Sequence, residues 1–487
     1  MNLAAVDLGS NSFRLEIGRV AGSHIERLGY WKETIRLAAG LTDDNRLTRR
    51  AIDTALDCLA RMNERLRGIP PAQVRAVGTQ TLRQATNSND FLVEAQAALG
   101  YPIEIISGRE EARLVFEGCM HLLPQSDTRR LVVDIGGAST ELIVGQGFAA
   151  AQAESFKVGC VNTTLRYFPD GRIDRTSFKR AVVGCAAEIE EAVAGFSRRN
   201  WDEAYGSSGT VGAAIDILRA EGWADGVITS EALLKLRQAI VGAGEIKRIR
   251  FAGMKPERQQ VIAGGTAVLC AVFETLGILE MRPAAGGLRV GVLYDLLGRR
   301  ERRDVREATV DRLQARYGVD RAQAERVGAL ARRFFDALAP QAGDEMVKRL
   351  AWAAALQEVG FAVSHNDHHK HGAYLIANGD LPGFSVTDQE RIALLVLGQR
   401  GNLRKLGEAL VDPERVAKVL ALRLAVIFCH ARRDAVAPQW TLKAGKSVIE
   451  LALDAAWRDR HPLTDHLLQE EAQHWDRVGV RFQLKAL

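Results

Sequence analysis

The chain has 487 residues, of which 47% are hydrophobic and 26% are charged. This balance is typical of a folded globular protein and excludes a disordered or collagen-like chain. A net charge of +5 at pH 7 is far from the dense positive charge of a dedicated nucleic-acid-binding protein, which disfavours nucleic acid as a partner. The six cysteines include no Cys-x-x-Cys pair, which argues against a zinc ribbon or a disulfide framework.

The sequence contains no apolar stretch of the roughly 18 residues that a membrane-spanning helix requires. No basic leader precedes the first apolar segment. We therefore expect a cytoplasmic protein, although peripheral association with a membrane stays open.

An internal repeat is the most informative feature of the chain. Residues 6–18 align with residues 133–145 at one constant offset, and six positions are identical, including Asp7 with Asp134. Each copy reads as an apolar strand, a turn of small residues and a second strand. This pattern predicts two β-hairpins.

Helical and strand patterns alternate after each hairpin. After the first copy, the sequence predicts a helix near 48–66, a strand at 73–79, a helix at 88–99, a strand at 102–106 and a helix from about 108. After the second copy, it predicts a helix at 174–197, a strand at 203–207, helices from about 210 and at 258–276, and a strand-like then helical pattern over 286–297. This alternation indicates two related α/β domains, at 1–122 and 123–298.

The composition changes from residue 299. The run from Arg299 to Arg303 is expected to form a charged linker or the start of a helix. Residues 299–435 are rich in Ala, Leu and Arg at helical spacing, which predicts a helical domain. Residues 436–487 are expected to form a small module with a hairpin between Trp440 and Leu451.

The two hairpin turns have the composition of phosphate-binding loops. Small residues let backbone N–H groups converge on an anion, and hydroxyl groups add donors. The alternative, plain turns that Asp7 and Asp134 merely hydrogen-bond, is disfavoured because the pattern occurs twice. A third loop, which ends a strand and opens a helix, could hold another anion. The predicted phosphate-binding residues are Gly9, Ser10, Asn11, Ser12, Gly136, Gly137, Ala138, Ser139, Thr140, Gly206, Ser207, Ser208 and Gly209.

These motifs together resemble the actin, Hsp70 and sugar-kinase superfamily. Within it they are similar to the exopolyphosphatase and guanosine pentaphosphate phosphohydrolase family, and most similar to its long exopolyphosphatases. Besides the three loops, the resemblance rests on residues 77–85, 106–113, 159–168, 254–265 and 291–295, so it covers essentially 1–298.

The resemblance implies a fold and an activity. The fold would be α/β, with duplicated ribonuclease-H-like (actin-like, ASKHA) domains, an all-α HD-like domain and a small α+β module. The activity would be Mg²⁺-dependent, processive hydrolysis of the terminal phosphate of inorganic polyphosphate. It also implies a homodimer in which the C-terminal half extends a phosphate channel.

The acidic start of the helix near 108 contains the expected general base. Ser107 and Glu110 have the spacing of a capping box, which gives Glu110 a structural role. The helix dipole alone would favour Glu111 in a first turn. The resemblance, however, places Glu111 at the family's general-base position, where it activates the attacking water. It likewise favours Arg83 as a phosphate clamp over a surface arginine.

Three carboxylates are the expected Mg²⁺ ligands. Asp7 and Asp134 each end the strand that leads into a loop, where a carboxylate suits Mg²⁺ that bridges phosphate oxygens. Glu141 follows the second loop and aligns with Arg14 of the first copy, which breaks the symmetry of the repeat. An ordinary strand residue is the alternative for Glu141.

A histidine cluster in the helical region suggests a second metal site. Its members are His365, His368, His369 and His371, and three of them have the spacing of one helix face. The position that carries a His-Asp pair in HD domains instead reads Gln357-Glu358. We therefore prefer a structural or interface role for these histidines.

Three other functions stay open at this point. The protein could convert guanosine pentaphosphate (pppGpp) to the tetraphosphate, act as a kinase of the same superfamily, or bind polyphosphate or nucleotides as a silent regulator. Phosphate release from polyphosphate or from pppGpp separates the first alternative. A kinase would consume ATP only with an acceptor, and a silent regulator would release nothing.

Overall fold

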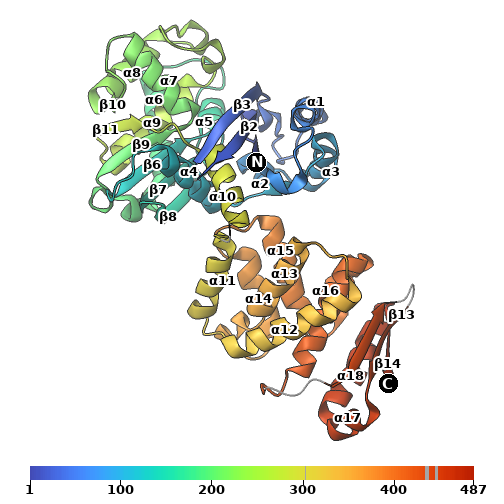
Figure 1. Cartoon of the computed structure of the whole chain (residues 1–487). Coiled ribbons are helices and arrows are strands. Elements are labelled where there is room, and N and C mark those ends of the chain that lie inside the picture. The colour runs from blue at the N-terminus through green and yellow to red at the C-terminus, as the bar shows by residue number, and fades with distance from the viewer. Residues whose placement is uncertain (23, 302, 434–437, 445–447) are drawn as a thin grey trace. The chain divides into compact units, whose positions relative to one another are not determined.

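The chain forms two compact units, Met1–Val305 and Arg306–Leu487. The computed structural model describes residues 1–22, 24–301, 303–433, 438–444 and 448–487 (Figure 1). Across these ranges, no helix is long and apolar enough to span a membrane. The four predicted domain ranges stay predictions.

A five-stranded sheet forms the first half of unit 1, in the order β3-β2-β1-β4-β5. Strands β1 and β2 pair antiparallel, which confirms the first predicted hairpin, whereas β4 runs parallel to both β1 and β5. The strands are β1 (Asn2–Leu8), β2 (Ser12–Ala21), β3 (His24–Thr34), β4 (Val74–Gly78) and β5 (Ile103–Ile105). The other elements are η1 (Leu37–Gly40), α1 (Arg49–Leu66), η2 (Pro71–Gln73), α2 (Gln80–Gln84) and α3 (Ser88–Leu99).

A six-stranded sheet forms the second half, in the order β10-β11-β9-β6-β7-β8. Its strands are β6 (Arg130–Ile135), β7 (Thr140–Gln146), β8 (Ala149–Phe156), β9 (Glu203–Ser207), β10 (Ile228–Thr229) and β11 (Glu280–Pro283). Strands β6 and β7 pair antiparallel, which confirms the second hairpin, and β9 runs parallel to β6. The arrangement β3-β2-β1-β4 therefore recurs as β8-β7-β6-β9, so the repeat in the sequence is a repeat of the sheet.

Helices cover this second sheet and connect the two halves. They are α4 (Gly108–Leu122), α5 (Cys160–Tyr167), α6 (Arg175–Glu190), α7 (Ser208–Ala220), α8 (Ser230–Ala243), α9 (Ile262–Leu276) and α10 (Leu288–Arg300), with short turns η3 (Val193–Phe196), η4 (Arg198–Asn200), η5 (Ile246–Arg248) and η6 (Pro256–Arg258). Helix α4 carries the chain from the first sheet to the second. Helix α10 returns to pack against α4 and β1.

Three sequence predictions in this half were wrong in their bounds. The helix predicted at 174–197 ends at Glu190, because the chain turns to bring Phe196 into the core, where it is fully buried. The helix predicted from 258 begins at Ile262, since the backbone of Val261 is not helical. The strand-like segment at 286 is a glycine loop, and the strand beside β9 is β11 instead.

Unit 2 begins with six helices and ends with a small sheet. The helices are α11 (Val305–Arg316), α12 (Arg321–Leu338), α13 (Asp344–Ala355), α14 (His368–Asn378), α15 (Val386–Gly398) and α16 (Pro413–Phe428), with η7 (Val359–Ala362) and η8 (Leu403–Val411). They are followed by β12 (Trp440–Ala444), β13 (Val448–Leu453), α17 (Ala455–Arg460), α18 (Pro462–Asp476) and β14 (Arg481–Ala486). The run predicted as a linker begins inside α10, which extends to Arg300, and Arg302 lies outside the described residues.

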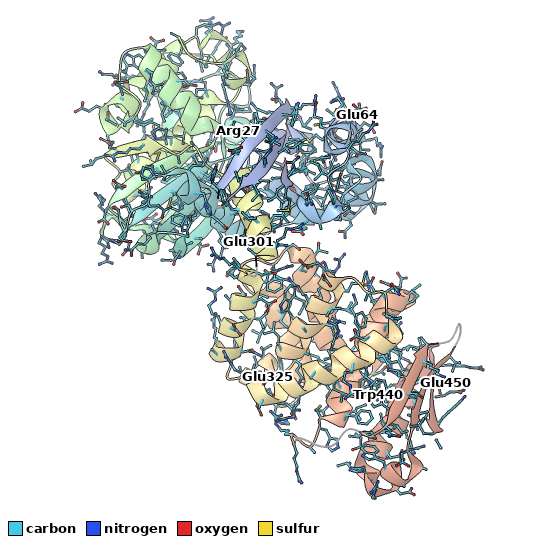
Figure 2. The ribbon with its side chains drawn as sticks, in the orientation of Figure 1. Arg27, Glu64, Glu301, Glu325, Trp440 and Glu450 are labelled. Carbon is cyan, nitrogen blue, oxygen red and sulfur yellow. The ribbon has the colours of Figure 1, made fainter. Side chains whose placement is uncertain are left out.

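The C-terminal sheet shares one hydrophobic core with the helices of unit 2. Strands β12 and β13 form the predicted hairpin, and β14 adds a parallel third strand. Trp440 begins β12, and its ring lies 4.7 Å from that of Phe334 on α12 (Figure 2). This contact ties the hairpin to the helices.

The histidine cluster lies around the start of α14. His368 and His369 are buried, and the ring of His368 packs 4.2 Å from Phe361. Glu358 is bound by Arg432, whose Nη1 lies 2.7 Å from its carboxylate. In the described part of the chain, no group of three or more His, Cys, Asp or Glu side chains is arranged to hold a metal ion.

Candidate active site

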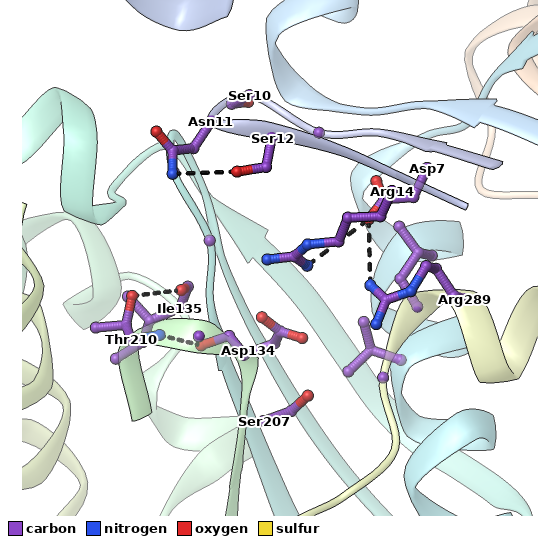
Figure 3. A pocket seen from close by; sticks show the side chains of 18 of the residues that line it. Asp7, Ser10, Asn11, Ser12, Arg14, Asp134, Ile135, Ser207, Thr210 and Arg289 are labelled. Carbon is purple, nitrogen blue, oxygen red and sulfur yellow. Dashed lines mark hydrogen bonds and ion pairs between the residues drawn. The ribbon is translucent and has the colours of Figure 1, made fainter. Parts of the chain in front are cut away.

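Both hairpin turns line one cavity of about 430 Å³ in unit 1 (Figure 3). The first turn contributes Gly9, Ser10, Asn11 and Ser12, the second contributes Gly136, Gly137 and Ser139, and the third loop contributes Ser207, Ser208 and Gly209. A Cβ atom added to Gly137 would lie 3.2 Å from the amide nitrogen of Asn11. The two turns therefore face one another closely, and glycine is what allows the approach.

The backbone of each turn is held from behind. The carbonyl oxygen of Asn11 accepts from Ile35 N–H at 3.0 Å, and that of Gly137 accepts from Val161 N–H at 2.8 Å. Within the described residues, the backbone N–H groups of Asn11 and Gly137 donate to no backbone acceptor, and the side-chain amide of Asn11 lies 3.5 Å from the hydroxyl oxygen of Ser12. Two turns with fixed carbonyls and unused amides form a site that suits an anion.

Four of the residues predicted to contact phosphate lie outside the lining of this cavity. They are Ala138, Thr140, Gly206 and Arg83. The hydroxyl group of Thr140 donates to Val158 O at 2.6 Å, and Gly206 is buried within β9. Arg83 donates instead to Glu111, at 2.9 Å between Nη1 and Oε2.

The cross-strand register explains why the two copies differ in charge. Asp7 on β1 lies opposite Arg14 on β2, whereas Asp134 on β6 lies opposite Glu141 on β7. Arg14 Nη1 approaches Asp7 at 3.8 Å, and Arg289 Nη1 approaches it at 3.7 Å (Figure 3). The first copy therefore carries ion pairs where the second carries two neighbouring carboxylates.

Glu111 lies in the first turn of α4 and lines the cavity. Ser107 caps this helix by accepting from Glu110 N–H, which confirms the Ser107 half of the predicted capping box. Burial raises the pKa of Glu111 to about 7; Arg83 opposes the shift, and the charges of Asp7 and Asp134 add to it. A carboxylate with this pKa can accept a proton near neutral pH.

The second copy holds the carboxylates that suit a cation. Burial, with the charges of Glu111 and Asp134, raises the pKa of Glu141 well above its usual range. Burial also raises the pKa of Asp134. Ser155 on β8 donates to Glu141 at 2.8 Å and orients it. Mg²⁺ is commonly bound by one or two carboxylates with substrate phosphates, so this donor set fits the ion.

A basic wall, which the sequence analysis did not identify, faces these carboxylates. It consists of Arg14, Lys32, Lys255, Arg258 and Arg289, all of which line the cavity. Burial, together with the charges of Arg258 and Arg14, lowers the pKa of Lys32. The Nε of Arg14 is buried and has no hydrogen-bond partner within the described residues. A crowded set of cations with a spare donor suits a polyanion.

The sequence signal for this wall was weak because its members come from distant segments. In the sequence, Arg14 stands out only because it aligns with Glu141 of the second copy. Arg289 lies shortly after Gly286 and Gly287, in a segment that the sequence analysis interpreted as strand-like. Lys255 and Arg258 belong to a segment of the family resemblance that carried no assigned role. Charge alone could not distinguish these residues from solvated surface cations.

Comparison with known proteins identifies the family of the chain. The model of the Ppx/GppA phosphatase family matches residues 17–300, and the model of Ppx/GppA phosphatase domain III matches residues 305–472. The solved structure of an exopolyphosphatase-like protein is 26% identical, with a TM-score of 0.56 over 62% of this chain and 98% of that chain.

Two further solved structures share the fold over part of this chain. An exopolyphosphatase from Cytophaga hutchinsonii is 22% identical, with a TM-score of 0.55 over 61% of this chain and 98% of that chain. The PPX-GPPA enzyme of Aquifex aeolicus is 24% identical, with a TM-score of 0.51 over 60% of this chain and 99% of that chain. With a family model that spans most of unit 1 and a second that spans most of unit 2, the chain belongs to the Ppx/GppA phosphatase family.

Proposed function

We propose that the protein is an exopolyphosphatase, which hydrolyses the terminal phosphoanhydride bond of inorganic polyphosphate and releases orthophosphate. One observation carries the proposal: two facing anion-binding turns, a carboxylate of pKa about 7 and a basic wall line a single cavity. The turns would hold the terminal phosphate through their free amides. The basic wall would hold the phosphates that follow it.

Glu111 acts as the general base. Its carboxylate takes a proton from a water molecule, whose oxygen forms a bond to the terminal phosphorus as the bridging P–O bond breaks. The shortened chain leaves with the bridging oxygen, and orthophosphate remains between the turns. Arg83 orients the Glu111 carboxylate through the 2.9 Å hydrogen bond.

Asp134 and Glu141 would hold Mg²⁺; among the described residues, Asp7 on the opposite turn does not complete a group of three metal-binding side chains with them. The bound ion would neutralise charge on the phosphate oxygens, which is the usual contribution of a divalent cation in phosphoryl transfer. Asp7 is the weaker candidate of the three because Arg14 and Arg289 already approach its carboxylate.

The lining favours a phosphate chain over a nucleotide. Among the described lining residues, Tyr30 is the single aromatic side chain. A nucleobase in this cavity that stacked on an aromatic ring would therefore stack on Tyr30. The guanidinium of Arg289 lies 5.1 Å from the centre of that ring, and that of Arg27 lies 6.0 Å away. Arg289, unlike Arg27, also lines the cavity, so a cation lies beside the ring that a base would stack on; this supports a phosphate chain without a base.

The deciding experiment compares orthophosphate release from long-chain polyphosphate and from pppGpp, at equal concentration with Mg²⁺. We expect faster release from polyphosphate, and Glu111→Gln should abolish it. Faster release from pppGpp would transfer the assignment to the nucleotide. Binding of polyphosphate without any release would support a silent regulator, and ATP consumption that depends on an acceptor would support a kinase. The homodimer and the phosphate channel through the C-terminal half stay predictions.

A further inference from the structure

Three elements that contribute to the cavity also meet at one buried carboxylate outside it. Strand β4 leads into Thr79, helix α4 carries Glu111, and helix α10 begins with Leu288 and Arg289, all four of which line the cavity. Further along α10, Asp295 is 4% exposed and does not line the cavity.

Asp295 binds an arginine from each of these elements. Its Oδ2 accepts from Arg75 Nη1 of β4 at 2.7 Å and from Arg299 Nε of α10 at 2.8 Å. Its Oδ1 accepts from Arg113 Nη2 of α4 at 2.6 Å. Although burial opposes it, the charges of Arg299, Arg75 and Arg113 hold the pKa of Asp295 well below its usual range. The carboxylate is therefore charged in the folded protein.

Two of these arginines also bind other carboxylates. The Arg75 side chain is 2% exposed, and its Nη2 has no hydrogen-bond partner within the described residues. Arg113 also binds Glu110, with Nε 2.8 Å from the carboxylate. It therefore links Asp295 to Glu110, the residue that precedes Glu111 in the chain. Arg75 also pairs with Glu104 at 3.1 Å, and Arg113 pairs with Glu117 at 2.7 Å. Removing the Asp295 charge would therefore leave these arginines their other carboxylates but would break the link that joins β4, α4 and α10.

The two helices are also in backbone contact. A Cβ atom added to Gly118 of α4 would collide with the carbonyl oxygen of Gly287, which directly precedes α10. One added to Gly291 of α10 would collide with the carbonyl oxygen of Leu114. At these two glycines the helix backbones are in contact, so we expect a displacement of α10 to pass to the helix that carries Glu111.

We propose that Asp295 is a positioning residue that holds Glu111 in register with the phosphate-binding turns. The inference rests on the proposed function. Asp295 acts through Arg113 and Arg75, and it touches neither the substrate nor the reacting water. A carboxylate that only stabilised the fold would change the amount of folded protein, but not the turnover of each folded molecule.

The test is Asp295→Asn, with kcat and KM for long-chain polyphosphate expressed per folded molecule. We expect kcat to fall by about tenfold to 10²-fold with KM within about twofold, because a misplaced base slows chemistry more than binding. Asp388→Asn is the matched control: Asp388 is buried in unit 2, with Arg349 Nε 2.9 Å from its carboxylate. Its kcat should stay within twofold of wild type. A folded Asp295→Asn variant with wild-type kcat would overturn the proposal.

A second readout does not require turnover. Amide hydrogen exchange in the first turns of α4, residues 108–114, should quicken in Asp295→Asn but not in Asp388→Asn. If the wild-type protein releases no phosphate, the proposed function fails. The positioning role of Asp295 is then decided by hydrogen exchange alone. Unchanged amide exchange at residues 108–114 in Asp295→Asn would overturn the positioning role.

If Asp295→Asn does not fold, Arg113→Lys takes its place. Lysine keeps the charge but cannot bridge Glu110 and Asp295 with a planar guanidinium. We expect at least a tenfold loss of kcat in this variant. Wild-type kcat in folded Arg113→Lys would contradict the proposal. Asp295→Glu keeps the negative charge, so a kcat between that of Arg113→Lys and that of wild type in this variant would support it.

Discussion

The two copies of the hairpin pair their strands in the same register but place different residues opposite the aspartate that precedes the turn. In the first copy Asp7 faces Arg14, and in the second Asp134 faces Glu141. Burial raises the pKa of Asp7, but Arg14 and Arg289 oppose the shift. The charges of Glu111 and Asp134 instead add to the effect of burial on the pKa of Glu141, although hydrogen bonds from Ser155 and Ser139 oppose it. The two turns are thus alike in backbone, and the carboxylate opposite Asp134 makes the second copy the one that suits a cation.

Because of this difference, we expect the two copies to have different roles in the site. We expect the first copy, with its basic neighbours, to control substrate binding. We expect the second copy, with Glu111 beside it, to control metal dependence and chemistry. The following variants test this division.

Glu111→Gln should have the largest effect. Loss of the general base should lower kcat by about 10³-fold, while polyphosphate affinity stays within about twofold. In wild type, kcat/KM should rise as the pH increases through about 7, since Glu111 accepts a proton only after it has lost its own. That limb should be absent from the residual activity of the variant. Steady-state kinetics from pH 5 to 9 and equilibrium binding give both results, and unchanged turnover would reject the base.

Asp134→Asn should lower kcat by about 10²-fold, the scale of one electrostatic stabiliser, and raise the Mg²⁺ concentration for half-maximal activity. Asp7→Asn serves as the matched variant in the first copy and should shift the Mg²⁺ requirement less. Titration of activity with Mg²⁺ measures both. Equal shifts in the two variants would show that the copies do not differ in metal binding.

Arg14→Met should raise KM for polyphosphate by about tenfold, or about 1.4 kcal/mol of binding free energy. The Mg²⁺ concentration for half-maximal activity should stay near wild type, because Arg14 belongs to the first copy. A large change in metal dependence with unchanged KM would reverse the roles of the copies.

Thr140→Val should have the smallest effect. Thr140 is fully buried and its hydroxyl group bonds Val158 O at 2.6 Å, so its loss should cost about 1 kcal/mol of unfolding free energy. Activity should stay within twofold, since the side chain does not line the cavity. Denaturant unfolding measures the first quantity. A selective loss of activity would restore Thr140 to the phosphate-binding set.

Much of the architecture could be predicted because its signals are local. Both hairpins, the helix at 88–99 and the C-terminal hairpin follow from alternation, helical spacing and turn residues within short segments. The end of α6 could not be predicted in this way, because the burial of Phe196 against distant residues decides where the chain turns. Local propensity is easily outweighed by such contacts.

For the site, the sequence was sufficient to identify many of the functional side chains but not which of them line the cavity. Arg83 was expected to clamp phosphate; in the fold it lies outside the lining of the cavity and donates to Glu111, which the sequence alone did not indicate. Alternation along β7 likewise puts Thr140 on the opposite face from Glu141. The basic wall was missed because its members are far apart along the chain.

By itself, the sequence determined the duplicated turns and the carboxylates beside them, because glycine, serine and aspartate at fixed spacing impose a local backbone and a local chemistry. Only the tertiary structure decided that Arg289 returns to Asp7 and that Asp295 gathers three arginines. The physical reason is that burial and charge act through space. The pKa of Glu111 is set by neighbours from both halves of unit 1, which no short segment of the chain contains.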